Sequence, residues 1–369
     1  MHIWKRYHIF VGGKLFTIEN RFMSRKSVLL ILTGGTIAMT QDPSTGALRP
    51  TGIEEVKRYM PELFQDNILV DIYSFNPLVD SSNINPPVWS KLATIVYENY
   101  NQYDGFVILH GTDTMAYSAS ALSFMLGNLG KPVVFTGAQL PMGLIRSDAR
   151  ENLLTAIEIA VAQDEEGQAL VPEVSIFFGD RLYRGNRTTK KNAEYFSAFK
   201  SYNYEPLAFA GVHIRYNTHL VHYPDPSKPL RLWTKFDQNV AILKIFPGIS
   251  QQVVEAMLNI PHLRAIVLET FGAGNAPSEP WIYEVLKNAI ANGLIVVNKT
   301  QCSAGSVEMG RYETSLNLLE AGVISGYDIT TEALLTKLMY LLGEYGNDTD
   351  KVREALQMDL CGEMTIEEI

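Results

Sequence analysis

The chain has 369 residues, which is long enough for two domains of ordinary size, each with its own core. Hydrophobic residues make up 46% of it and charged residues 19%, a balance that excludes a largely disordered protein. The formal net charge of −9 argues against nucleic acid or an anionic membrane surface as a partner. The two cysteines, Cys302 and Cys361, exclude a disulfide-rich scaffold, so we expect a reducing compartment, with the cytoplasm as the default.

Residues 1–22 carry basic side chains but neither a clean apolar stretch nor a small-residue cleavage site of a secretory signal. We expect them to form a loosely ordered N-terminal extension, because the first strand pattern begins only after Met23. No stretch approaches the roughly 20 apolar residues that a membrane-spanning helix needs. The sequence therefore predicts no membrane partner.

In the first half of the chain, short apolar runs rich in β-branched and aromatic residues alternate with segments of helical periodicity. The predicted strands are residues 28–32, 68–75, 106–109, 133–136 and 174–178. The predicted helices are residues 89–100, 115–128 and 149–163. Alternation of this kind is typical of an α/β domain with a parallel sheet covered on both faces.

From residue 202 to 237 no period holds, and the many prolines and polar residues indicate a linker. The alternation then resumes, with strands at 240–245, 265–268 and 294–297 and helices at 251–258, 279–291 and 331–342. We therefore predict four parts: an extension over 1–22, an N-terminal domain over 23–205, a linker over 206–237 and a smaller C-terminal α/β domain over 238–369.

The first predicted strand ends in Thr33-Gly34-Gly35-Thr36, where two glycines permit positive φ and a close approach to a ligand. The residues that follow do not fit the G-x-G-x-x-G dinucleotide fingerprint, and the P-loop spacing occurs nowhere in the chain. The turn instead presents a hydroxyl on each side of the glycine pair. Because ligands of open parallel sheets bind beyond the carboxyl ends of the strands, it is a candidate site.

The loops after the other strands are also rich in hydroxyls and small residues, and each has an ordinary explanation. Asp80, Ser81 and Ser82 stand where residues that cap a helix occur, as do Thr112 and Asp113 in the loop after the third strand.

Two further residues of these loops also have ordinary explanations. Lys190 lies in a polar run that is typical of a solvated surface. His110 directly follows a buried strand, and we predict a hydrogen-bonded core histidine rather than a metal ligand, because no H-x-x-x-H or C-x-x-C spacing occurs.

Taken together, these loops indicate acyl transfer. Two of them each present a threonine beside a glycine turn, Thr36 and Thr112, and the second also presents Asp113. Because a threonine hydroxyl is a weak nucleophile, it needs a base, which a lysine kept neutral by burial (Lys190) or a tyrosine provides. The substrate would be a small carbonyl compound whose charged ends are held by serine hydroxyls, helix N-terminal amides and Asp113.

The stretches TGGTIA and HGTDTMAYSASALSFML resemble the bacterial-type L-asparaginase family. Its cytoplasmic (type I) branch is the most similar, through LYRGNRTTK, FPGIS, GNAP and NKTQC. The resemblance runs from about Val28 to the C-terminus. It implies a flavodoxin-like N-terminal sheet, no cofactor or metal, and hydrolysis of L-asparagine to L-aspartate and ammonia through a threonine acyl-enzyme.

The resemblance assigns catalytic roles to matching positions. Thr36 matches the nucleophile that forms the acyl-enzyme. Thr112, Asp113 and Lys190 match a polar triad, in which Asp113 also takes the α-ammonium of the substrate as a charge-assisted bond. The backbone amides of Gly111 and Thr112 are candidates for the oxyanion hole.

The resemblance also implies binding residues and an oligomer. Asp80, Ser81 and Ser82 match the segment that holds the α-carboxylate. Family members complete each site with a segment from a neighbouring subunit, and that segment corresponds here to the region around Asn275. A homodimer or homotetramer is therefore implied.

This chain departs from the family pattern in two places. The loop after Thr36 has no tyrosine, although many relatives place a catalytic one there, so we expect Tyr312 of the C-terminal domain to replace it. The type I resemblance also implies a second asparagine site around Cys302. Some members carry an arginine there, whereas this chain has Glu269 and Thr270.

Two alternatives to an asparaginase remain open. One is the related amidotransferase subunit that supplies ammonia for a tRNA-bound substrate; we expect that subunit to need a further N-terminal domain, for which 22 residues are too few. The other is a non-catalytic small-molecule sensor, against which the joint presence of both threonines, Asp113 and Lys190 argues.

Overall fold

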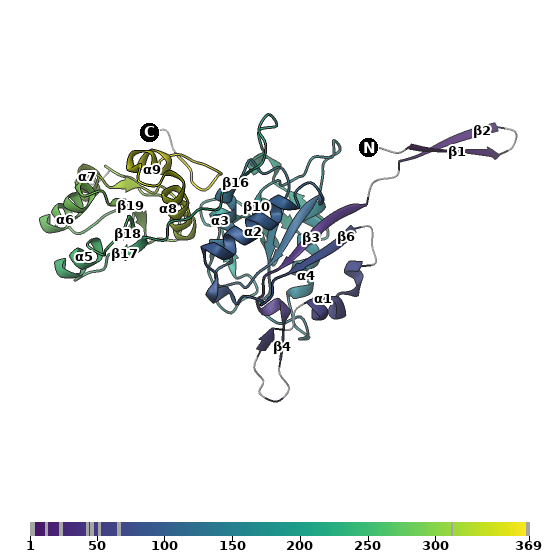
Figure 1. Cartoon of the computed structure of the whole chain (residues 1–369), viewed down its shortest axis with the longest axis horizontal. Helices are drawn as coiled ribbons and strands as arrows, with labels where there is room; N and C mark the ends of the chain where they lie inside the picture. The colour runs from purple at the N-terminus through teal and green to yellow at the C-terminus, as the bar shows by residue number, and fades with distance from the viewer. Residues whose placement is uncertain are drawn as a thin grey trace.

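The computed structural model describes residues 4–11, 14–21, 25–41, 44, 48–50, 53–64, 68–310 and 313–366. Near the N-terminus, β1 (Trp4–Val11) and β2 (Lys14–Arg21) pair as an antiparallel hairpin that projects away from the main sheet (Figure 1). The hairpin lies within the N-terminal extension that we expected over residues 1–22, and the loose order of that extension stays a prediction.

The N-terminal domain is built on an eight-stranded sheet. Its five parallel strands are β3 (Lys26–Leu32), β6 (Ile68–Ser74), β7 (Gly105–Leu109), β9 (Val133–Thr136) and β10 (Val174–Phe178). They lie in the order β6-β3-β7-β9-β10, which is the 2-1-3-4-5 order of flavodoxin-like sheets. The predicted fold class is confirmed, and the five predicted strands agree with these bounds to within two residues at each end.

Helices cover both faces of this sheet (Figure 1). On one face lie α2 (Pro86–Glu98) and α3 (Met115–Met125), and on the other α1 (Ile53–Tyr59) and α4 (Ala149–Val161). Leu29 and Ile31 of β3 point to the first core, while Val28, Leu30 and Leu32 point to the second. Burial on both sides explains why β3 is a continuous apolar run in the sequence.

The segment that we expected to be a linker contributes to this domain. Beyond β10 the sheet continues with antiparallel strands: β11 (Arg181–Arg184), which precedes the segment, and β14 (Ala208–Ala210) and β15 (Ile214–Tyr216), which lie within it. Later in the segment, β16 (Arg231–Leu232) pairs with β8 (Leu126–Gly127), so α3 ends before the predicted residue 128. Strands of two or three residues are too short to show periodicity, and pairing to existing strands orders them. The exact domain boundaries stay a prediction.

The smaller C-terminal α/β domain is also present as predicted. Its parallel sheet has the order β17 (Val240–Lys244), β18 (Ala265–Thr270), β19 (Ile295–Thr300) and β20 (Ile324–Ser325). One face packs against α5 (Gln251–Leu258), α6 (Pro280–Ala291) and α7 (Glu313–Glu320), and the other against α8 (Thr331–Tyr345) and α9 (Thr349–Leu356). None of the helices in the described ranges combines the length and the apolar character that crossing a membrane requires.

Candidate active site

The two threonine loops meet at the centre of the large sheet. They follow β3 and β7, which are adjacent parallel strands, and the strand order reverses between these two strands. This switch point is where open α/β sheets bind ligands. The loop after β6 joins them, because the amide of Val79 donates to the carbonyl of Thr33 over 2.7 Å.

Glycines allow these loops to pack main chain against main chain. Gly35 has φ 87°, and a Cβ at this residue would lie 2.6 Å from the backbone nitrogen of Gly111. A Cβ at Gly111 would lie 2.4 Å from Oγ of Ser81. Because real Cβ atoms do not approach other atoms so closely, only glycine fits either position. The glycine pair that the sequence singled out therefore serves this close approach between loops.

The two hydroxyls of the first turn have different environments. Thr33 is buried, and its Oγ1 donates to the carbonyl of Leu109 over 2.9 Å. Thr36 is partly exposed and begins the short 3-10 helix η1 (Thr36–Ala38). Thr33 therefore stabilises the turn, whereas Thr36 is the residue that the turn presents at the open edge of the sheet.

Lys190 reaches the loop after β7 from another part of the sheet edge. It lies on β12 (Thr189–Lys190), which pairs with β13 (Phe199–Lys200). Its Nζ donates to Oγ1 of Thr112 over 2.8 Å and to Oδ1 of Asp113 over 2.6 Å. The Lys190 side chain is only 18% exposed. The lysine is therefore held in a polar cluster, in an ion pair, and is neither solvated nor isolated by burial.

Gln139 is a member of this cluster that the sequence did not single out. Oγ1 of Thr112 donates to Oε1 of Gln139 over 3.3 Å, while Nε2 of Gln139 donates to the carbonyls of Ala193 and Tyr195. The hydroxyl of Thr112 therefore accepts from Lys190 and donates to Gln139. The only signal for Gln139 in the sequence was its place in the loop after the fourth predicted strand.

The segment around Asp80 forms the third wall of this region. Oδ1 of Asp80 accepts hydrogen bonds from the amide and the hydroxyl of Ser82, over 2.8 and 2.7 Å. These two bonds lower the pKa of Asp80, the backbone bond having the larger effect. Ser81 is buried, and its carbonyl accepts from Oγ1 of Thr114 over 2.7 Å. Asp80 thus caps the short helix η3 (Ser81–Asn83) and also fixes the Ser82 hydroxyl.

The capping explanation does not hold for Thr112 and Asp113. The residue at the N-cap of α3 is Thr114, which makes no side-chain capping bond. Thr112 and Asp113 lie before the cap, and both side chains are engaged by Lys190. Their hydrogen-bonding groups therefore face the cluster instead of the helix end.

His110 is the core histidine that the sequence predicted. It is 1% exposed, its Nδ1 donates to the carbonyl of Gly111 over 2.7 Å, and its Nε2 accepts from Oγ of Ser118 over 2.9 Å. Ser118 in turn accepts from Nε1 of Trp89. Burial lowers the pKa of His110 to about 4, because the charged imidazolium would lose its hydration. A neutral His110 thus anchors the backbone beside Gly111.

Two contacts connect this region to the C-terminal domain. Oγ1 of Thr189, the neighbour of Lys190, donates to the buried carboxylate of Glu332 in the first turn of α8. Burial raises the pKa of Glu332. Arg187 and Asp328 form a second link, an ion pair of 2.8 Å whose side chains are 3% and 10% exposed.

The remaining predicted site residues lie elsewhere or outside the described ranges. Asn275 lies in a tight turn after β18 in the C-terminal domain, where its amide donates to the carbonyl of Phe271 over 2.8 Å. Tyr312 falls outside the residues that the structure describes. Cys302 and Glu269 line a small cavity of about 160 Å³. Thr270 does not line this cavity, because its hydroxyl donates to Oδ1 of Asn298 over 2.7 Å in the core.

Residues 27–222 match the family model described as Asparaginase, N-terminal, and residues 239–356 match that of the Glutaminase/Asparaginase C-terminal domain. The chain belongs to the asparaginase family. It is 44% identical over 345 residues to L-asparaginase 1 of Escherichia coli (strain K12), covering 93% of this chain and 99% of that relative.

Two other asparaginase-family comparisons extend this result. The 60 kDa lysophospholipase of Homo sapiens is 42% identical over 364 residues, covering 92% of this chain and 62% of that protein. The crystal structure of L-asparaginase I from Vibrio cholerae superimposes with a TM-score of 0.83 at 43% identity, covering 93% of this chain and 100% of that one.

Within the described ranges, no three His, Cys, Asp or Glu side chains are grouped so that they could hold a metal ion.

Proposed function

We propose that this member of the asparaginase family hydrolyses the side-chain amide of L-asparagine to give L-aspartate and ammonia. The observation that carries the proposal is the pair of bonds from Lys190 to Thr112 and Asp113 at the switch point of the sheet. A lysine held against a hydroxyl and a carboxylate, beside a glycine turn that presents Thr36, supplies the parts that acyl transfer needs.

In the proposed first step, the hydroxyl oxygen of Thr36 attacks the amide carbon of the substrate side chain. The Thr36 proton passes to a base, for which we propose Tyr312, and then to the leaving nitrogen, which departs as ammonia. The backbone amides of Gly111 and Thr112 would stabilise the oxyanion. Water then hydrolyses the threonine ester, which releases aspartate and restores the Thr36 hydroxyl.

The charged ends of the substrate would be held by the other loops. Asp113 is 68% exposed and accepts from Lys190 with only one of its oxygens in the described contacts, so its carboxylate can also bind the α-ammonium. The segment Asp80–Ser82 is the proposed partner of the α-carboxylate, with the amide and hydroxyl of Ser81 as its donors. The amide and hydroxyl of Ser82 already donate to Asp80, which fixes the shape of this turn.

We further propose that the protein is a cytoplasmic homodimer or homotetramer in which Asn275 completes the site of a neighbouring subunit. Subunit complementation tests this arrangement. Thr36→Val and Asn275→Ala proteins, each inactive alone, are unfolded and refolded together. If Asn275 acts across the interface, the mixture regains part of the activity, because one site of each hybrid has both native residues. No recovery in hybrids that light scattering shows to be oligomeric would contradict it.

The decisive test of the activity is ammonia release by the purified protein with L-asparagine, measured in a coupled assay and matched to aspartate formed. We expect one ammonia per aspartate without any tRNA. A sensor would bind asparagine without releasing ammonia, and an amidotransferase subunit would release it only when its partner and tRNA substrate are present. Parallel assays with glutamine measure the preference between the two amides.

A further inference from the structure

A cavity of about 670 Å³ lies at the opposite end of the N-terminal domain from the threonine loops. It is lined by the last turn of α3, the start of β10, the segment 222–233 and the second half of α8. Because α3 starts just after the loop that carries Thr112, its 11 residues separate that loop from the cavity by roughly 16 Å of helix. The cavity is therefore a different site from the candidate active site.

Both domains contribute to the cavity, and its lining is partly aromatic. Phe124 of the N-terminal domain stacks on Tyr340 of the C-terminal domain, with ring centroids 5.9 Å apart, and Trp233 packs edge-on against Tyr340. Tyr345 and Leu360 add exposed apolar surface. Ligand sites typically have this size, occur between domains and combine an apolar lining with a few polar groups.

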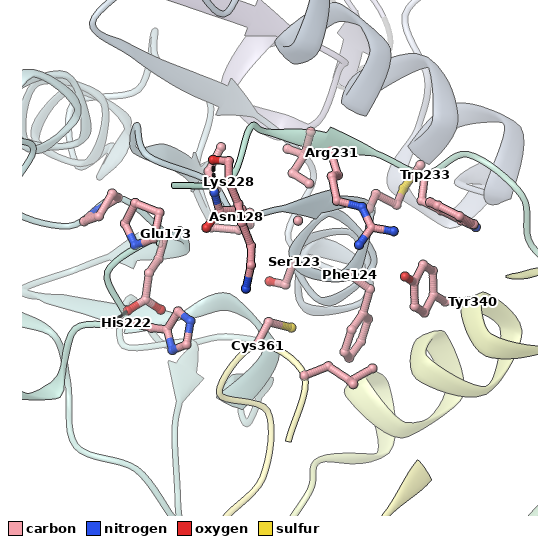
Figure 2. A pocket seen from close by; sticks show the side chains of 18 of the residues that line it. Ser123, Phe124, Asn128, Glu173, His222, Lys228, Arg231, Trp233, Tyr340 and Cys361 are labelled. Atoms are coloured by element: carbon pink, nitrogen blue, oxygen red, sulfur yellow. Dashed lines mark hydrogen bonds between the residues drawn. The ribbon is translucent and has the colours of Figure 1, made fainter. Parts of the chain in front are cut away.

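Cationic groups face the same space. In Figure 2 the ammonium of Lys228 and the guanidinium of Arg231 point toward the middle of the cavity, on either side of Ser123. The lining holds as many carboxylates as Lys and Arg side chains, so the ion pairs among them decide which cation is left for a ligand.

The carboxylates of the cavity leave one of these cations without a direct ion pair. Glu173 is in a buried ion pair with Arg184 at 2.6 Å, and Asp225 pairs with Lys228 at 3.0 Å. The carboxylate of Glu344 accepts from the hydroxyl of Tyr340, and burial, followed by this bond, raises the pKa of Tyr340.

Arg231, in contrast, lies over the Trp233 ring at 5.5 Å, and across the described part of the chain no carboxylate is within 4.0 Å of its guanidinium. An anion is the natural partner for a guanidinium in that position.

We propose that this cavity binds a small amphipathic anion, with a flat apolar body against the partly exposed rings of Trp233 and Tyr340 and its anionic group at Arg231. The proposed binding does not depend on the asparagine reaction, so the two proposals can be tested separately. Glu344 would accept a hydrogen bond from a donor on the ligand.

The probe pair 8-anilino-1-naphthalenesulfonate and N-phenyl-1-naphthylamine tests this inference, because the two share one aromatic body and only the first carries an anion. We expect the sulfonate to bind the wild-type protein saturably, one per chain, with enhanced fluorescence. The uncharged amine should bind about tenfold more weakly, the usual scale for a lost charge-assisted bond. Equal affinity for the two probes, or no saturable binding, would overturn the proposal.

Variants locate the binding. Arg231→Gln should weaken the sulfonate about tenfold and leave the uncharged amine unchanged, whereas Arg231→Lys should keep most of the affinity. Arg215→Gln is the matched control, because it removes the same charge from the exposed edge strand β15. An equal effect of Arg215→Gln, or no effect of Arg231→Gln, would mean that the probe does not occupy this cavity.

Two further measurements test whether the probe binds in the candidate active site instead of the cavity. Thr36→Val should bind the sulfonate as the wild type does, and saturating L-asparagine should not displace it. Displacement by asparagine would overturn the proposal. Ser123→Phe is expected to fill the cavity and abolish binding of both probes, with unchanged ammonia release as evidence that the variant is folded; if it does not fold, Arg231→Gln decides alone.

Discussion

The ammonium of Lys190 lies 2.8 Å from the hydroxyl oxygen of Thr112, although 78 residues separate the two in the sequence. The contact exists because β12 carries the lysine back over the carboxyl edge of the sheet, beside the loop that follows β7. A second bond to Asp113 fixes the same ammonium. Lys190 is thus held at two points, which is the arrangement expected of a group that orients others.

Replacing Lys190 by methionine should lower kcat at least ~100-fold and raise KM much less, since its interaction matters mainly in the transition state. Lys191→Met is the control, because Lys191 directly follows Lys190 and is exposed, so this variant removes the same charge without touching the polar cluster. Steady-state kinetics on asparagine measure both. Equal kcat and KM for the two variants would show that Lys190 has no role in catalysis.

Thr36→Val and Thr33→Val should show opposite signatures. Thr36→Val removes the proposed nucleophile and should lower activity by several orders of magnitude with little change in Tm. Thr33→Val removes a buried hydrogen bond to Leu109, which should cost about 1 kcal/mol of stability and only modest activity. If Thr36→Val kept more than roughly a tenth of the wild-type kcat, Thr36 would not be the nucleophile.

Gly35→Ala should reduce stability and activity by more than the strain of a positive φ alone would cause. Gly293 has a similar φ, 94° against 87°, but a Cβ there would meet no atom within 4 Å. Gly293→Ala should therefore cost only about 1–2 kcal/mol of backbone strain. Gly35→Ala adds a clash with Gly111 and should also abolish activity. Similar losses of stability and activity in both variants would contradict the packing argument.

The stability of the protein should fall as the pH drops from about 6.5 toward 4, in part because of His110. Its folded pKa of about 4 lies below the ordinary 6.5, so the unfolded chain binds the proton first, and stability is lost as the pH falls through this window. The upper limit of this effect is roughly 3 kcal/mol. Urea titrations of wild type and His110→Gln should show a shallower pH slope for the variant; parallel slopes would refute the assignment.

Tyr312→Phe tests the proposed replacement for the missing loop tyrosine. We expect kcat to fall at least ~100-fold, the usual scale for a general base. Tyr97→Phe on α2 is the control, because its side chain is 44% exposed and lies on the helix surface. A Tyr312→Phe protein within a factor of three of the wild type would show that Thr36 is activated by another group.

The sequence predicted the parts of the fold that are buried on both faces. β3, β7 and β9 are continuous apolar runs because helices cover both sides, so the existence of these strands could be inferred from the residues, whereas the flavodoxin-like sheet was implied only by the family resemblance. β14 and β15 could not be inferred, since three residues at a sheet edge show no period and owe their order to tertiary pairing.

The candidate site was predicted to a similar degree. Thr36, Thr112, Asp113 and Lys190 could be named from the motifs, and the structure places the last three in direct contact. The contact of Gln139 with Thr112 could not be predicted, because it depends on the relative positions of two loops that are distant in the sequence. Residues that act between subunits, as proposed for Asn275, have no signature in a single chain at all.

The links from Thr189 to Glu332 and from Arg187 to Asp328 join the segment 187–190, which ends in Lys190, to the C-terminal domain. The lysine therefore depends on a second cooperative unit as well as on its own sheet. If the C-terminal domain opens first under mild denaturant, the segment 187–190 loses both of these contacts while the large sheet is still intact. Enzymatic activity should then disappear at a lower denaturant concentration than the far-UV signal, so inactivation reports on the docking of the domains before global unfolding begins.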